Sequence, residues 1–215
     1  MNNLENKLWE ISNDLRGTMD ASEFKNYILG FMFYRFLSNN IEELTNKVIK
    51  EENLTGDITP EYAEAIKQEC LRVYGYYIED KYYYSTLVDN IKKGNPIIED
   101  LQNSFQEILN STTGQDSEED FIGLFDDIDT NNNKIGSTPD ERNKTLSNII
   151  LKLNDIEFDK DIDMLGNAYE YLLKQFASSA GKKGGEFYTP SEVSSLVAKL
   201  ASYGHDKALN VYDPT

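Results

Sequence analysis

The sequence predicts a mainly α-helical chain that passes, near its C-terminus, into the first elements of an α/β domain. Apolar residues recur at helical spacing through most of the chain before residue 160. Two segments, Thr59–Glu61 and Thr138–Glu141, open with a threonine cap and a proline followed by acidic residues, which is typical of helix starts. A helix, an apolar run and an acidic residue then follow one another over residues 190–213, the order in which cofactor-binding α/β domains begin.

The first two helices are predicted from their apolar residues. The first carries Leu4, Leu8, Ile11 and Leu15 at helical spacing. We expect Gly17 to end it, and a second helix to start at Asp20, which has Glu23 three positions later. Apolar residues cover much of the circumference of this second helix over residues 24–37 and continue to Val48. That part of the helix is therefore expected to be buried.

A third helix is predicted from Thr59 to about Tyr74, with Gly75 after its last turn. The tyrosine-rich segment 76–84 follows, which we interpret as irregular or as a short strand. Rows of tyrosines can stack on nucleic acid bases, but such sites pair them with Lys and Arg, and here Glu79 and Asp80 flank a single lysine. We therefore favour a packing role for these tyrosines.

Further helices are predicted on either side of a polar stretch. One runs through Leu101, Phe105, Ile108 and Leu109. Residues 111–120 are interpreted as a mobile linker, and another helix starts at Thr138 and carries apolar residues to Leu153. Residues 127–138 imitate a calcium loop, but Asn132 stands where such a loop needs glycine and Thr138 where it needs glutamate, so an EF-hand is rejected.

Composition excludes several classes of protein. The net charge of −17 repels DNA phosphates, so this chain alone should bind duplex DNA weakly. The alternative interpretation is that the acidity only aids solubility. Cys70 and His205 are single, which rules out an intrachain disulfide and a structural zinc site of Cys and His. No apolar run is long enough to span a membrane, and no signal peptide pattern is present, so we expect a cytoplasmic protein.

The organisation changes after residue 160. We assign residues 1–160 to a helical N-terminal domain and residues 161–215 to the start of a second domain. The second part is predicted to contain a helix over residues 165–176, a glycine-containing loop, a helix that begins after Thr189 and Pro190, and a strand over residues 208–212. Asp213 follows the strand, at the edge where α/β domains meet their ligands.

The segment Gly184-Gly185-Glu186-Phe187-Tyr188-Thr189-Pro190 has the composition of a ligand-binding loop. Glycines allow the backbone to approach a ligand, the aromatic pair offers a wall for an adenosyl group, and the amides at the next helix start favour an anion. A glycine-rich turn before a helix is also often only a turn, as is a lone Asp-Pro.

Taken together, segments 161–172, 177–190 and 211–215 closely resemble the modification (M) subunit of type I restriction–modification systems. Residues 8–37 also resemble the helical N-terminal domain of that family. The resemblance implies a DNA adenine methyltransferase that uses S-adenosylmethionine. It also implies an α/β domain of Rossmann-like fold, of which this chain holds only the truncated start: a helix, a loop, a helix and the first strand.

The resemblance also implies roles for individual residues. The cofactor-binding residues would be Glu186, Phe187, Tyr188, Thr189, Pro190, Ser191 and Asp213. The family's glycine loop would follow Thr215, and its catalytic Asn-Pro-Pro-aromatic motif is absent, because the Asn-Pro at Asn95 is followed by isoleucines. We therefore assign no catalytic residue and no metal ligand, and expect a truncated protein that is inactive alone and binds the cofactor weakly or not at all.

The family's partners are a specificity (S) subunit, the restriction subunit in the restriction complex, and double-stranded DNA in the assembled complex. A local basic cluster for phosphate would be Lys174, Lys182 and Lys183, which could equally be solvated lysines. Two alternatives stay open: a free-standing helical module for protein–protein interaction, and a methyltransferase fused to a nuclease in one chain.

Overall fold

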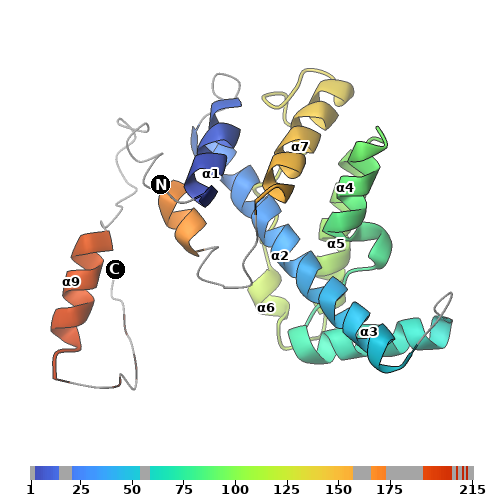
Figure 1. Cartoon of the computed structure of the whole chain (residues 1–215), viewed down its shortest axis with the longest axis horizontal. Coiled ribbons are helices and arrows are strands. Elements are labelled where there is room, and N and C mark those ends of the chain that lie inside the picture. The colour runs from blue at the N-terminus through green and yellow to red at the C-terminus, as the bar shows by residue number, and fades with distance from the viewer. Residues whose placement is uncertain are drawn as a thin grey trace.

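The computed structural model describes residues 3–14, 21–53, 59–156, 166–172 and 191–204, together with Lys207, Asn210 and Tyr212. All regular structure within these ranges is helical (Figure 1). The helices are α1 (Asn3–Asp14), α2 (Ala21–Glu51), α3 (Pro60–Tyr74), the 3₁₀ turn η1 (Asp80–Tyr82), α4 (Tyr84–Lys92), α5 (Ile98–Thr112), α6 (Glu118–Phe121), α7 (Pro139–Asn154), residues 166–172 and α9 (Ser191–Ala201). The predicted mainly α-helical class is confirmed.

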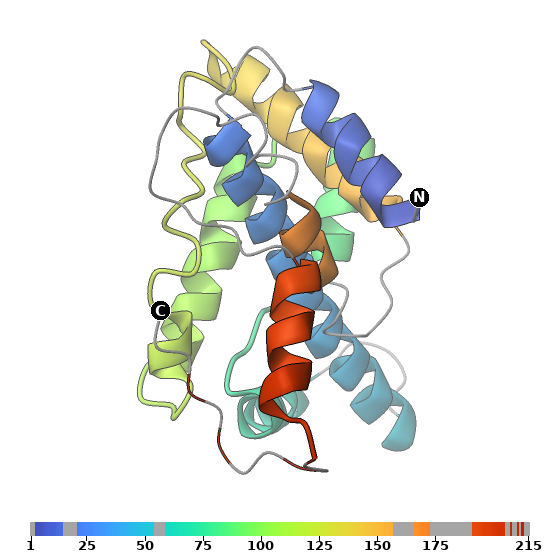
Figure 2. The same cartoon turned by 90° about the vertical axis from the view of Figure 1, so that its left-hand side faces the viewer.

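The body is arranged around α2, which is 31 residues long and runs through the molecule in Figures 1 and 2. Its apolar residues are buried on several sides, as the sequence predicts for residues 24–37. Helices α3, α4 and α7 contact α2, and α1 lies along α7 (Figure 2). One buried cluster joins residues from α1 to α7.

Helix α3 has the predicted bounds because both of its ends are capped. The backbone N–H of Tyr62 donates to Thr59 Oγ1 at 3.4 Å, and Pro60 occupies the first turn. At the other end Gly75 has a φ of 76°, and its N–H donates to the carbonyl of Leu71 at 2.9 Å. This left-handed conformation is accessible to glycine at little cost, which explains the stop.

The tyrosine-rich segment differs from the prediction. It is irregular only up to Tyr83, with the turn η1 inside it, and α4 begins at Tyr84 and was not predicted. Tyr84, Leu87 and Val88 are buried on one face of α4. Packing of that face against the body outweighs the preference of aromatic residues for extended structure. The predicted packing role is confirmed, since Tyr76, Tyr83 and Tyr84 are buried.

The buried tyrosine hydroxyl groups are satisfied by backbone oxygens around α2. Tyr34 on α2 donates to the carbonyl of Tyr82 at 2.6 Å, and its hydroxyl lies 3.1 Å from Ser104 Oγ on α5. Tyr76 donates to the carbonyl of Leu37 at 3.0 Å. These bonds join α2 to α5 and to the segment before α4, and they leave neither of these two buried hydroxyl groups without a partner.

The polar stretch 111–120 is part of the packed body. Helix α5 continues to Thr112, which is buried, and α6 starts at Glu118. Ser117 Oγ donates to the carbonyl of Gly75 at 2.6 Å and ties the connection to the end of α3. The interpretation of the stretch as a linker is therefore wrong, because its small polar side chains bond to nearby backbone.

Helix α7 begins as predicted. Thr138 Oγ1 accepts a hydrogen bond from the backbone N–H of Glu141, and Glu141 Oε2 accepts one from the backbone N–H of Thr138. Together these bonds form a complete capping box. The predicted strand over residues 208–212 lies mostly outside the described residues, and Asn210 and Tyr212 have no regular secondary structure.

The glycine at the end of α3 provides a stability test. In Gly75→Ala the new Cβ would lie 2.5 Å from Ser117 Oγ in a backbone with φ of 76°, so we expect a loss of about 2–3 kcal/mol in the free energy of unfolding. Gly94→Ala is the matched control, because Gly94 has φ of 80° but no neighbouring atom within 4 Å. It should lose only about 1 kcal/mol. Urea unfolding of both variants checks this, and equal losses would contradict it.

Candidate functional site

The predicted cofactor-binding residues lie almost entirely outside the described part of the chain. This applies to Glu186, Phe187, Tyr188, Thr189, Pro190 and Asp213, and also to the lysines Lys174, Lys182 and Lys183. Ser191 is the first residue of α9, so a helix begins where the sequence predicts one. The assignment of these residues to a cofactor site therefore remains a prediction.

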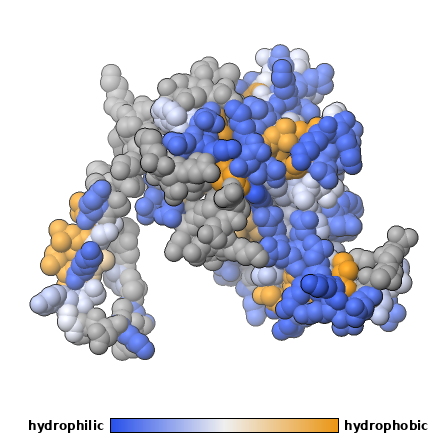
Figure 3. All heavy atoms as spheres, in the orientation of Figure 1, coloured by the Kyte–Doolittle hydropathy of each residue, from blue (hydrophilic) through white to orange (hydrophobic). Residues whose placement is uncertain are grey.

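Helix α9 presents an uncovered apolar face. Val193, Leu196, Val197 and Leu200 recur at helical spacing, and Leu200 is 68% exposed. Figure 3 shows these apolar atoms gathered on α9, which lies apart from the body in Figure 1. Exposed apolar residues gathered on one side of a helix form a surface for contact with other apolar residues.

The helix at residues 166–172 behaves differently, because it packs onto the body. Ala168 and Leu172 have 0% exposure and belong to the same buried cluster as residues of α1 and α2. Tyr169, on the other side of the helix, is exposed. The first described helix after residue 160 is therefore anchored on the preceding helices. The boundary at residue 160 stays a prediction.

The side chain of Arg35 lies at the C-terminus of α7. Arg35 projects from α2, and its Nη1 donates to the carbonyl of Leu153 at 2.5 Å and to that of Ile156 at 3.0 Å. Its guanidinium also lies over the ring of Tyr84, 5.7 Å from the centroid. Burial lowers the pKa of Arg35 from its usual value. The carbonyls of a last helical turn have no partner within the helix, and Arg35 supplies one.

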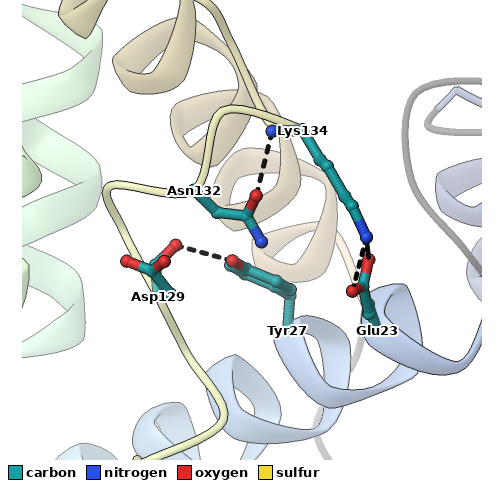
Figure 4. Close-up of polar contacts among 5 residues, drawn as sticks. All are labelled: Glu23, Tyr27, Asp129, Asn132 and Lys134. Atoms are coloured by element: carbon teal, nitrogen blue, oxygen red, sulfur yellow. Dashed lines mark hydrogen bonds and ion pairs between the residues drawn. The ribbon is translucent and has the colours of Figure 1, made fainter.

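The loop before α7 is attached to the start of α2 (Figure 4). Tyr27 donates its hydroxyl to the carbonyl of Asp129 at 2.6 Å, and Lys134 Nζ pairs with Glu23 at 2.6 Å. Asn132 Oδ1 accepts from the N–H of Lys134. Burial of Tyr27 is the main reason that its pKa rises to about 12. These contacts hold the calcium-like segment 127–138 against the start of α2, so the segment has a structural role.

A hollow of about 440 Å³ lies between α3 and α5. Lys67, Tyr77, Glu79 and Glu107 line it. Glu107 Oε1 accepts from the N–H of Glu79 at 3.0 Å, whereas Oε2 is buried without a hydrogen-bond partner. Burial, and then the charge of Glu79, raise the pKa of Glu107 to about 7.

Sequence reasoning did not single out Glu107, because nothing distinguishes it from other acids on the polar side of a helix. Arg35 carried a recognisable signal, since it is a charged residue within the apolar stretch 24–37. A charge at such a position needs partners in the fold.

The described ranges contain no candidate metal site and no candidate membrane span. No group of three or more His, Cys, Asp or Glu side chains there could hold a metal ion. No helix in these ranges is both long and apolar enough to cross a membrane.

Two families match successive parts of the chain. The HsdM N-terminal domain family matches residues 4–153, and the N-6 DNA Methylase family matches residues 160–215. The type I restriction enzyme MpnII methylase subunit of Mycoplasma pneumoniae is 37% identical over 99% of this chain and 42% of its own length. The MjaIX methylase subunit of Methanocaldococcus jannaschii is 27% identical over 98% of this chain and 37% of its own length.

The fold also matches a solved structure. The crystal structure of the type I restriction-modification system methyltransferase subunit from Streptococcus thermophilus superposes with a TM-score of 0.77 at 32% identity. The match covers 94% of this chain and 44% of that one. The chain thus spans about two fifths of the length of the relatives it matches.

Glu107 predicts a pH dependence of stability. Its pKa is about 7 in the folded chain and lower when unfolded, so the folded state binds the proton more tightly. The resulting stability is complete below the unfolded pKa, near 4.3, and is lost as the pH rises through about 7. In Glu107→Gln the uncharged amide avoids this loss, so we expect the variant to gain about 1 kcal/mol over the wild type at pH 8, allowing for a half-exposed side chain.

Chemical denaturation at pH 5 and pH 8 measures this effect. Glu99→Gln is the control, because Glu99 lies in the first turn of the same helix but outside the hollow. An equal difference between wild type and Glu107→Gln at the two pH values would contradict the assignment.

Proposed function

The chain belongs to the HsdM N-terminal domain family of type I restriction–modification methylase subunits, and we propose that the protein it forms part of methylates adenine in DNA. The methyl group would come from S-adenosylmethionine and go to the adenine amino nitrogen at a specific site. The observation that carries this proposal is the order of the two matched families, helical domain and then DNA methylase, along one chain.

The cofactor assignment rests on the segment before α9. We propose that Glu186, Phe187, Tyr188, Thr189, Pro190 and Ser191 form one wall of the S-adenosylmethionine site and that Asp213 lies at its edge. S-adenosylmethionine supplies a methyl group bound to a positively charged sulfur. Helix α9 begins at Ser191, so its first N–H groups have no partner within the helix, and they suit the carboxylate of the cofactor.

The exposed apolar face of α9 suits a helix of an α/β domain. In such domains helices cover the sheet with their apolar side. We propose that the sheet of the whole methyltransferase domain covers Val193, Leu196, Val197 and Leu200, which accounts for their exposure here.

The proposed partners are those that the family implies, and the charge of the chain agrees with them. The net charge of −17 disfavours direct DNA binding by most of this surface, and residues 94–133 contain no Lys, Arg or His at all. We propose that a specificity subunit carries base recognition, that the restriction subunit joins the complex for cleavage, and that double-stranded DNA is held in the assembled complex. The face formed by α5 and α6 would point away from the DNA.

A free-standing interaction module is the alternative. It would account for the acidic surface and the buried aromatic residues, but it offers no reason for the match of residues 160–215 to a DNA methylase family or for the bare face of α9. These two features favour the methyltransferase.

Methyl transfer is tested on the whole subunit with its specificity subunit. With S-adenosylmethionine labelled in its methyl group, we expect label in DNA and recovery of N6-methyladenine after digestion. The 215-residue chain alone should transfer none, because the catalytic motif is absent from it. Label in cytosine, or none in a complex that binds DNA, would refute the proposal.

Calorimetry tests the division of the cofactor site. The 215-residue chain should show no binding of S-adenosylmethionine at micromolar concentration, while the whole subunit should bind it. Micromolar binding by the shorter chain would mean that residues 186–191 and 213 form most of the pocket.

A further inference from the structure

The end of α7 is held by a side chain from another helix. Arg35 on α2 donates through one nitrogen, Nη1, to the carbonyls of Leu153 and Ile156. Both carbonyls lie near the end of the described range 59–156, and Leu153 and Ile156 are themselves buried. A positive charge at the C-terminus of a helix also matches the negative end of its dipole.

A second bond reinforces the same turn. The hydroxyl of Tyr84 on α4 donates to the carbonyl of Ile150 at 2.8 Å, and Arg35 lies against the ring of Tyr84. The last two turns of α7 are therefore held from α2 and from α4. Because the guanidinium is partly desolvated, it stabilises the fold only while its oxygen partners stay in place.

The chain is anchored again shortly afterwards. In the helix 166–172, Ala168 and Leu172 are fully buried in the cluster that also contains Leu8, Ile28 and Leu153. Residue 156 and residue 168 are thus both attached to one body of helices. The chain is thus fixed at the end of the helical domain by Arg35, and again at the helix 166–172 by the core.

We propose that Arg35 is a positioning residue for the methyltransferase domain. By holding the carbonyls of Leu153 and Ile156, it determines where the chain leaves the helical domain and hence how the helix 166–172 and the domain after it are placed. Because Nη1 already donates to two backbone carbonyls, this nitrogen is not available to bind a DNA phosphate. The inference rests on the proposed function and adds a residue that acts on the reaction without touching substrate or cofactor.

The first experiment measures methyl transfer in the whole subunit with its specificity subunit. Arg35→Met keeps much of the side-chain length and loses all donors, so we expect kcat/KM for DNA to fall at least about tenfold, since small misplacements of a site are costly. The Kd for S-adenosylmethionine should change less than about twofold, because the proposed role of Arg35 concerns the placement of the domain and not cofactor binding. Arg35→Lys should recover part of the rate, since its ammonium can donate to one of the two carbonyls.

Two controls separate positioning from stability. Arg72→Met removes an exposed arginine paired with Glu69 on α3, away from the end of α7, and should leave kcat/KM unchanged. Ile108→Val trims the buried core on α5 and should lower the melting temperature while leaving kcat/KM unchanged. A loss with Ile108→Val as large as with Arg35→Met, or a wild-type rate in Arg35→Met, overturns the inference.

The second experiment does not depend on catalysis. Amide hydrogen exchange on the 215-residue chain should be about tenfold faster in Arg35→Met, both at residues 150–156 and at residues 166–172, but unchanged in α3. Faster exchange confined to residues 150–156, or none, overturns the inference. If the wild-type complex transfers no methyl group, the proposed function fails, and the exchange result still decides whether Arg35 holds the junction.

Discussion

Tyrosine hydroxyl groups bonded to backbone oxygens around α2 are the interaction on which the packing of this protein depends. A helix as apolar as α2 must be covered on several sides, and the residues that cover it are mostly aliphatic with several tyrosines among them. Each buried hydroxyl needs a partner, because an unpaired one costs about 1–3 kcal/mol. Tyr27, Tyr34, Tyr76 and Tyr84 find theirs on carbonyls from Leu37 to Ile150, so the bonds also set how neighbouring elements lie.

The same arrangement bears on the proposed role of the helical domain in a methyltransferase. The body is held by a core and by directional bonds, and Arg35 binds the end of α7. The next described helix returns to that core through Ala168 and Leu172. A helix packed on the body fixes where the chain continues, whereas a free linker would leave the orientation of the next domain open.

The sequence predictions are correct where interactions within one turn fix the structure, and they fail where contacts between distant residues do. Local signals located the starts of α3 and α7 and the end of α3, because caps, prolines and a left-handed glycine act within one turn. The same reasoning missed α4 and misread residues 111–120 as a linker. Tyr84 favours helix only through packing and its bond to Ile150, and Ser117 is ordered by the carbonyl of Gly75. Of the predicted cofactor residues, the structure describes only the place of Ser191 at the start of α9.

The sequence by itself determined the helical class, the family and the order of the two matched family segments, because periodicity, capping residues and motifs lie along the chain. The tertiary structure alone decided which charged residues matter in the described part. The sequence marks Arg35 as a charge in an apolar stretch but does not identify the two carbonyls that it meets at the end of α7. Glu107 differs from other acids on α5 only in its surroundings, which leave one buried oxygen without a partner. Desolvation and hydrogen-bond geometry arise from contacts between residues far apart in sequence, and no local pattern encodes them.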